Sequence, residues 1–134
     1  MKAIDLMIGD YCLVKPSMMP IKVAAVHQKK VAYHAVTNKL NWVKESLLEP
    51  IRLITPEILV KNGFTPIYHD KSAYKWKEYD NDDNIQSIVI DFQVKRTCEV
   101  WNGKAKKSYK GEILCLHELQ HIMKICGINK TIEL

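Results

Sequence analysis

The chain has 134 residues, of which 47% are hydrophobic and 26% charged, and its formal net charge is +5. The apolar fraction is too high for a disordered polar tract, and five Gly with five Pro are too few for a low-complexity or collagen-like chain. At this length folding buries about two-thirds of the surface of the unfolded chain, which is enough for one shared core or two small lobes.

The first 54 residues are predicted to form short strands separated by turn-like segments. The strands are Tyr11–Lys15, Ile21–His27, Val31–Val36, Leu40–Lys44 and Glu49–Leu53. Segments 16–20, 28–30 and 37–39 separate them with residues that end or reverse a strand. Because closure removes the exposed edges of so short a meander, we predict an SH3-like small β-barrel over residues 1–54.

A short helix is predicted directly after this lobe. Thr55 is a typical N-cap, Pro56 suits the first helical position, and Glu57 places an acid in the first turn. The pair Asn62-Gly63 is a stop signal.

The next segment is predicted to be a β-meander. Residues 73–79 and 85–101 flank a polar hairpin loop at 80–84, and apolar side chains occupy the even positions from Ile88 to Val100. This period of two indicates one long strand with a buried face. Asn102-Gly103 is typical of a tight type I′ turn, so Lys104–Tyr109 is expected to run back as the third strand.

The last predicted element is an amphipathic helix from about Leu114 to Cys126, ended by Gly127. Its apolar stripe should cover the sheet and contains Cys115, Leu116, Leu119, Ile122, Met123 and Cys126. His117 and His121 project to nearly the opposite side, so we expect them in solvent. The fold class is therefore α+β, with a barrel at 1–54 and a meander lobe with its C-terminal helix at 55–134.

The compartment and the redox state follow from what the sequence lacks. No stretch approaches the roughly 18 to 20 apolar residues that span a bilayer, and residues 1–9 do not resemble a secretory signal, so the cytoplasm is expected and a membrane partner is not. Cys12, Cys98, Cys115 and Cys126 form no C-x-x-C pair and have apolar neighbours, which favours reduced core residues. No cofactor is predicted.

Basic residues interleaved with aromatics are the main binding signal. A surplus of positive charge lies in residues 1–54, while the near-neutral remainder separates an acidic cluster at 78–83 from a basic one at 95–110. Lysines can contact phosphates and aromatic rings can stack on bases. The candidate nucleic-acid contacts are Trp101, Lys104, Lys106, Lys107, Tyr109 and Lys110, and Lys75, Trp76, Lys77 and Tyr79 alternate in the same way. The alternative interpretation is that these are ordinary strand formers and edge-protecting lysines.

A metal-dependent alternative rests on the segment 117–121, which matches H-E-x-x-H. In that motif His117 and His121 would bind zinc and Glu118 would act as general base, which describes a metallopeptidase. No third ligand is evident by spacing, and the extended motif fails because Lys124 and Gly127 replace the Gly and His it requires.

Other chemical signatures are incomplete. The acidic loop begins like a calcium loop at Asp80, but Ile85 replaces the required Gly and Asp91 the bidentate Glu. Phosphate-loop, dinucleotide and serine-hydrolase motifs are missing from the sequence. Cys115 and His117 project about 200° apart on a helix, so they are not expected to meet as nucleophile and base.

Three segments, 5–11, 55–64 and 116–121, together resemble a family of small uncharacterised proteins common in Bacteroides-type genomes, often encoded beside phage or mobile-element genes. The resemblance covers the whole chain in order. Many members look like H-Q-L-Q-N at the last segment. This implies that Glu118 and His121 are not needed and that His117, Leu119 and Gln120 belong to a structural or contact helix.

The sequence thus favours a non-enzymatic cytoplasmic binding module whose partner is a protein or a nucleic acid. The enzyme alternative predicts about one equivalent of bound zinc. A purely structural subunit would instead form a defined homo-oligomer and bind neither metal nor oligonucleotide.

Overall fold

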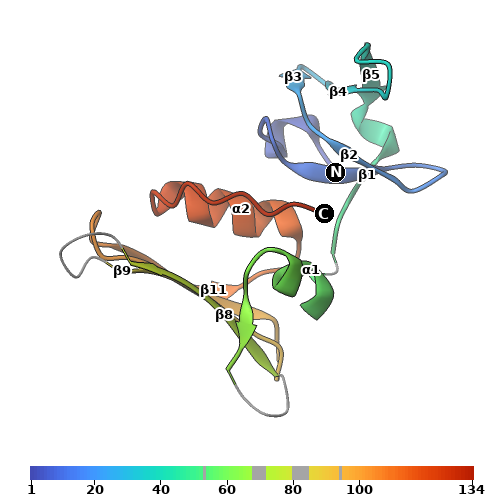
Figure 1. The fold of residues 1–134 in the computed structure, drawn as a ribbon. Helices are drawn as coiled ribbons and strands as arrows, with labels where there is room; N and C mark the ends of the chain where they lie inside the picture. The colour runs from blue at the N-terminus through green and yellow to red at the C-terminus, as the bar shows by residue number, and fades with distance from the viewer. Residues whose placement is uncertain (53, 68–71, 80–84, 94) are drawn as a thin grey trace. The chain divides into compact units, whose positions relative to one another are not determined.

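The computed structural model describes residues 1–52, 54–67, 72–79, 85–93 and 95–134, and within them the chain is mostly β with two helices (Figure 1). It divides into two compact units. The first comprises Met1–Arg52 with Cys115–His117, and the second comprises Leu53–Leu114 with Glu118–Leu134. No helix among the described residues combines the length and the apolar character needed to cross a membrane.

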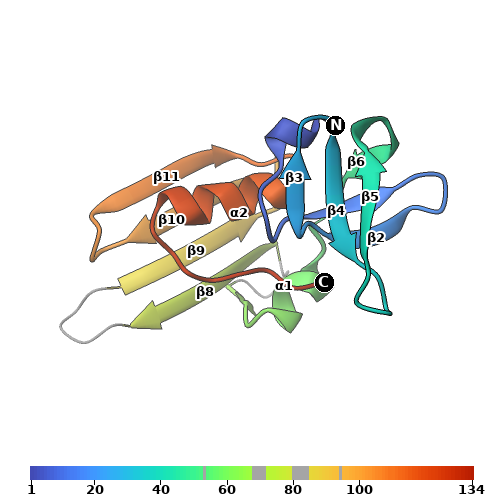
Figure 2. The same cartoon turned by 90° about the horizontal axis from the view of Figure 1, so that it is seen from above.

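The first unit contains two three-stranded antiparallel sheets, β2–β1–β6 and β3–β4–β5 (Figure 2). The 3₁₀ turns η1 (Ala3–Asp5) and η2 (Glu45–Leu47) accompany them. The strands are β1 (Tyr11–Val14), β2 (Met19–Lys22), β3 (Ala25–His27), β4 (Lys30–His34), β5 (Leu40–Lys44) and β6 (Leu48–Pro50).

The described strands of this unit do not close into a barrel, because the predicted strand 21–27 is divided between the two sheets. At the division, Val23 N donates to Asp10 O at 2.8 Å and Ala24 N donates to Ala32 O at 2.8 Å. The chain therefore passes from the β1 sheet to the β4 sheet between these two residues, instead of continuing one ladder.

The core of the first unit contains residues of η1 and of the strands, which pack together. It contains Ala3, Leu6, Cys12, Ile21, Val23, Val31 and Leu48, with Met1, Val14, Tyr33 and Val43 packed against it. The Glu45 carboxylate accepts a hydrogen bond from Ala3 N at 3.0 Å, which fixes η1 beside η2. Packing and one charge-assisted hydrogen bond thus hold η1 in place.

The second unit is a five-stranded antiparallel meander in the order β11–β10–β9–β8–β7, with two helices (Figures 1 and 2). Its elements are α1 (Pro56–Lys61), β7 (Thr65–Pro66), β8 (Ala73–Tyr79), β9 (Ile85–Asp91), β10 (Thr97–Asn102), β11 (Lys107–Glu112) and α2 (Leu116–Ile125) from Glu118 onward. Helix α2 lies along one face of the sheet, as predicted, and its apolar residues Leu116, Leu119 and Met123 are fully buried.

The predicted single strand 85–101 is wrong, because this segment is the β9–β10 hairpin. Asp91 ends β9 by accepting a hydrogen bond from Gln93 N at 2.8 Å, and Thr97 then pairs back with Asp91. Since Cys98 opposes Ile90 and Val100 opposes Ile88, even positions face the same side in both strands. The alternation of the sequence is therefore the same for a hairpin in this register as for one long strand.

The helix ends follow the predicted signals. Thr55 Oγ1 accepts a hydrogen bond from Ile58 N at 3.3 Å, and Gly63 takes a φ of +86° after α1. Gly127 follows α2 with a φ of +75°.

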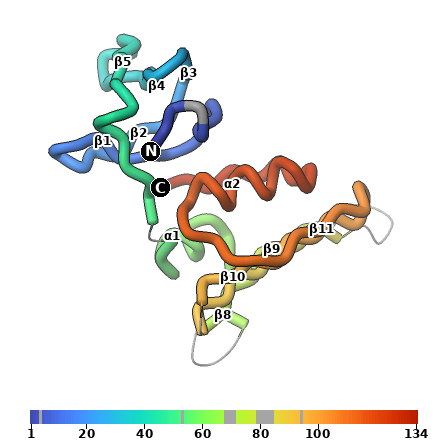
Figure 3. Tube along the Cα trace, turned by 180° about the vertical axis from the view of Figure 1, so that it is seen from behind, coloured from blue at the N-terminus to red at the C-terminus, as the bar shows by residue number. Residues whose placement is uncertain are grey.

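Beyond α2 the C-terminal segment returns along the helix toward α1 (Figure 3). Gln120 Nε2 donates to Ile132 O at 3.0 Å, and the side chain of Asn62 exchanges two hydrogen bonds with the backbone of Glu133. Gln120 therefore has a structural role within α2.

Candidate nucleic-acid interface

The five-stranded sheet has one face covered by α2 and one opposite face, which we call the open face. Antiparallel register assigns residues to it in cross-strand rows. One row is Lys77, Ser87, Trp101 and Ser108; the next is Lys75, Val89, Glu99 and Lys110. The alternate positions Ile88, Ile90, Cys98 and Val100 are buried on the covered face. The hairpin β10–β11 thus presents every second side chain away from α2.

Trp101 is the prominent aromatic group of the open face, with 44% of its surface exposed. Its ring borders a hollow of the sheet that is lined by Ser87, Val89, Glu99, Ser108 and Lys110 among others. Lys77 and Lys75 stand on β8 two strands away, and Lys110 stands on β11 on the other side. An indole with cations on both flanks is an arrangement that can stack a planar base and contact its phosphates.

The predicted contact residues do not all reach this face. Trp101 and Lys110 lie on it, whereas Lys107 and Tyr109 lie on the face covered by α2. Lys107 Nζ donates to Ile125 O at 3.4 Å, where a cation suits the carboxyl end of a helix. A Cβ atom at Gly111 would come within 2.7 Å of the Tyr109 hydroxyl, so a larger residue there would require this side chain to shift.

Lys104 and Lys106 lie in the turn that joins β10 to β11, and this turn differs from the predicted type I′ turn. Asn102 pairs with Lys107 and the four residues between them form the turn, in which Lys106 takes a φ of +52°. The Asn102 side chain accepts from Ala105 N at 3.3 Å and donates to Cys126 O at 2.9 Å. Asn102 is therefore held in the strand, and the reversal occurs after it.

The aromatic and basic residues of β8 separate onto different faces. Trp76 opposes the buried Ile88 on the covered face, and Lys130 Nζ lies 5.1 Å from the centre of its ring. Lys75 and Lys77 therefore accompany Trp101, not their sequence neighbour Trp76. The side chain of Tyr79 and the acidic loop at 80–84 lie outside the described residues.

Carboxylates offset part of the positive charge on the open face. Lys110 Nζ lies 3.5 Å from Glu99, and Lys95 Nζ lies 2.9 Å from Glu112. The hydrogen bond that Lys95 donates to Glu112, together with the negative charge of this carboxylate, raises the pKa of Lys95. Exposed pairs of this kind contribute little to stability, so their lysines can exchange one anionic partner for another.

The candidate metallopeptidase segment 117–121 lies within α2. The Glu118 carboxylate accepts a hydrogen bond from Leu114 N at 2.7 Å, so it caps the start of α2. Over the described ranges, no group of three or more His, Cys, Asp or Glu side chains could hold a metal ion. His117 and His121 are both half-buried, although the helical projection predicts them in solvent.

Contrary to the prediction, Cys115 and His117 meet: Cys115 Sγ lies 3.7 Å from His117 Nε2. The projection at 100° per residue fails because α2 begins at Leu116, which leaves Cys115 outside the helix. All four cysteines are buried, as predicted for core residues. Cys115 and His117 both belong to the first unit.

The sequence interpretation misses a second basic surface, on the sheet β3–β4–β5. There Lys30 lies directly opposite Lys44, and the exposed Trp42 lies on the same face. The surplus of positive charge in residues 1–54 is the signal that could have drawn attention to it. No family model, no curated protein and no solved structure matches this chain.

Proposed function

We propose that the protein is a non-enzymatic binding module and that the open face of its five-stranded sheet contacts single-stranded nucleic acid. The observation that carries the proposal is the exposure of Trp101 in a row of the sheet, with Lys77 on one side and Lys110 in the adjoining row on the other. An exposed indole is costly to leave in water and inexpensive to cover with a planar base.

The physical logic divides the work between two kinds of group. Trp101 supplies a stacking surface for an unpaired base, and base–aromatic stacking contributes about 1–3 kcal/mol per base. Lys75, Lys77 and Lys110, with Lys104 and Lys106 in the adjoining turn, supply cations for the phosphates. Stacking requires bases that are not already stacked in a duplex, which favours a single strand.

Three further parts of this proposal rest on the sequence. The short strands of the first unit support an SH3-like arrangement that is open and not closed. The resemblance of segments 5–11, 55–64 and 116–121 supports a role beside phage or mobile-element genes. The same resemblance supports a cytoplasmic protein that acts on a partner.

The direct test is binding of a fluorescently labelled single-stranded oligonucleotide of about ten nucleotides, followed by anisotropy over a range of salt concentrations. We expect affinity that falls steeply as salt rises, because lysines that contact phosphates release counterions. Replacing Trp101 with Ala should weaken binding by about tenfold or more, given the energy of one stacked base. Unchanged affinity in this variant, or no binding at low salt, would overturn the proposal.

Strand β11 offers a matched pair of lysine variants. Lys110→Gln and Lys107→Gln remove the same charge from the same strand, but only Lys110 lies on the open face. Lys110→Gln should weaken binding and make its salt dependence shallower, whereas Lys107→Gln should leave both unchanged. Equal effects of the two substitutions would mean that net charge, and not this face, determines binding.

A further inference from the structure

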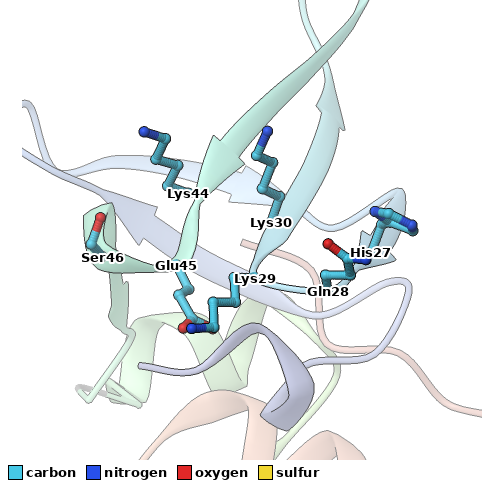
Figure 4. Close-up of a pocket in the computed structure, with 7 residues that line it drawn as sticks. All are labelled: His27, Gln28, Lys29, Lys30, Lys44, Glu45 and Ser46. Atoms are coloured by element: carbon cyan, nitrogen blue, oxygen red, sulfur yellow. The ribbon is translucent and has the colours of Figure 1, made fainter.

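A pair of lysines faces the same side of the sheet β3–β4–β5 in the first unit. Lys30 and Lys44 are direct cross-strand partners, and His27 is the partner of Lys30 on the next strand. Figure 4 shows the two lysine side chains extending to the same side of the strand pair. They border a hollow of about 800 Å³ whose lining also includes Gln28, Lys29 and Ser46.

Two like charges placed directly opposite each other on a sheet destabilise it. The carboxylate that lines this hollow belongs to Glu45, and it accepts the hydrogen bond from Ala3 N that fixes η1. Figure 4 places the Glu45 side chain on the other side of the strand pair from the ends of Lys30 and Lys44. The lysine pair is therefore arranged so that an anion between the two ammonium groups would relieve their repulsion.

An aromatic surface adjoins the lysine pair. Trp42 lies two residues before Lys44 on β5 and so shares its face, and 48% of its surface is exposed. The His27 ring meets Trp42 edge-on, with 6.3 Å between ring centres and 80° between planes. This contact restrains the indole, and the exposed part of its surface is available to a planar group.

We propose that Lys30, Lys44 and Trp42 form a nucleotide site in which the lysine pair binds a phosphate group and the indole stacks on the base. A carboxylate partner such as an acidic peptide would satisfy the lysines but leave the Trp42 ring exposed. The site belongs to a different unit from the open face and does not depend on the function proposed for that face. The phosphate could belong to a mononucleotide or to a nucleic-acid strand, since both present the same chemistry.

The test uses the full chain with Trp76→Phe and Trp101→Phe, so that Trp42 is the remaining tryptophan and its fluorescence reports on this site alone. Circular dichroism establishes that the variant is folded, and a thermal-shift titration of the wild-type chain repeats the measurement without these substitutions. The probes are adenosine 5′-monophosphate, adenosine, inorganic phosphate and a short oligo-dT strand.

We expect saturable quenching by the mononucleotide and weaker binding of adenosine and of phosphate, because each lacks one half of the recognised group. Lys44→Met should weaken mononucleotide binding by about fivefold, the loss expected for one exposed ion pair. Lys39→Met removes the same charge at an exposed position of the β4–β5 connection and should have no effect. If oligo-dT binds far more tightly than the mononucleotide, the phosphate source is a strand.

A second readout separates ligand binding from a structural role for Lys44. In low salt without ligand, Lys44→Met should raise the unfolding temperature or leave it unchanged, because it removes the repulsion with Lys30. At the same concentration, nucleotide should raise the unfolding temperature of the wild type more than that of Lys44→Met. Absence of saturable quenching, equal binding by Lys44→Met, or tighter binding of an acidic peptide than of the mononucleotide would each overturn the proposal.

Discussion

Asn102 joins the β10–β11 hairpin to the end of α2 through a buried hydrogen bond from its Nδ2 to the carbonyl oxygen of Cys126, at 2.9 Å. The same side chain accepts from Ala105 N, and only 3% of the residue is exposed. A Cβ atom at Gly127 would lie 3.2 Å from this amide nitrogen. The hairpin and the helix end are thus fitted around one polar group.

Replacing Asn102 with Ala should lower the free energy of unfolding by about 1–3 kcal/mol, because the buried carbonyl of Cys126 loses its donor. Urea unfolding followed by circular dichroism measures the change, and Asn129→Ala at an exposed position serves as the control. A loss below about 0.5 kcal/mol, the usual range for surface substitutions, would show that the contact is not required.

Glu118 provides a test of how the segment 117–121 is used. Since its carboxylate caps the backbone N–H of Leu114, Glu118→Ala should destabilise the protein by about 1 kcal/mol. Glu118→Gln keeps an oxygen that can accept the bond and should cost less. Thermal unfolding of both variants, with elemental analysis of zinc in the wild type, distinguishes a cap from a metallopeptidase base. Equal stability of all three chains would contradict the capping role.

Local signals in the sequence predict the helices better than the strand pairing. Thr55 precedes α1 and Gly63 follows it, as expected, because capping depends on residues that are close together in the chain. The sequence pattern does not reveal the β9–β10 hairpin, because its register preserves the alternation of Ile88, Ile90, Cys98 and Val100. The turn begins at Asp91, and one acid between the apolar Ile90 and Phe92 is a weak signal in the sequence.

The candidate surfaces also depend on strand pairing, which the sequence predicts less well than it predicts helices. The β10–β11 register places Trp101 and Lys110 on the open face, and it places Lys107 and Tyr109 on the face covered by α2. A one-residue change in the length of the turn would reverse the faces of the β11 residues. Lys30 and Lys44 are fourteen positions apart in the sequence, and the β4–β5 register places them directly opposite each other. Sequence alone could give the charge surplus but not this juxtaposition.

The buried thiol of Cys98 predicts a loss of stability at high pH. Burial, with smaller effects from Cys126 and Glu99, raises its pKa from 9.0 to about 12. Above pH 9 the unfolded chain ionises this thiol while the folded protein keeps the proton, so the stabilisation is complete below the unfolded pKa and is lost as pH rises through the folded one. Stability should therefore fall between about pH 9 and pH 12.

Urea unfolding under reducing conditions at pH 7.5, 9.5 and 10.5 measures this effect. Because lysines and tyrosines also titrate in this range, the comparison is with Cys98→Ala, whose stability should fall less steeply over the same interval. Cys12, whose pKa burial raises to about 11, gives a second variant with the same expected direction. Parallel pH profiles for the wild type and both variants would contradict the assignment.

The position of Glu99 predicts a substitution that improves binding. Glu99 lies between Val89 and Lys110 in a row of the open face, and its carboxylate is 3.5 Å from Lys110 Nζ. A phosphate that approaches Trp101 is repelled by this carboxylate and must compete with it for the lysine. Glu99→Gln removes both effects while keeping a side chain of the same size, so it should tighten oligonucleotide binding several-fold at low salt, with a smaller gain at high salt.

Glu57→Gln, at an exposed position of α1, makes the same change in net charge and should alter binding little. If the two substitutions tighten binding equally, the long-range charge of the protein is responsible; if Glu99→Gln has no effect, the strand does not contact this row of the sheet.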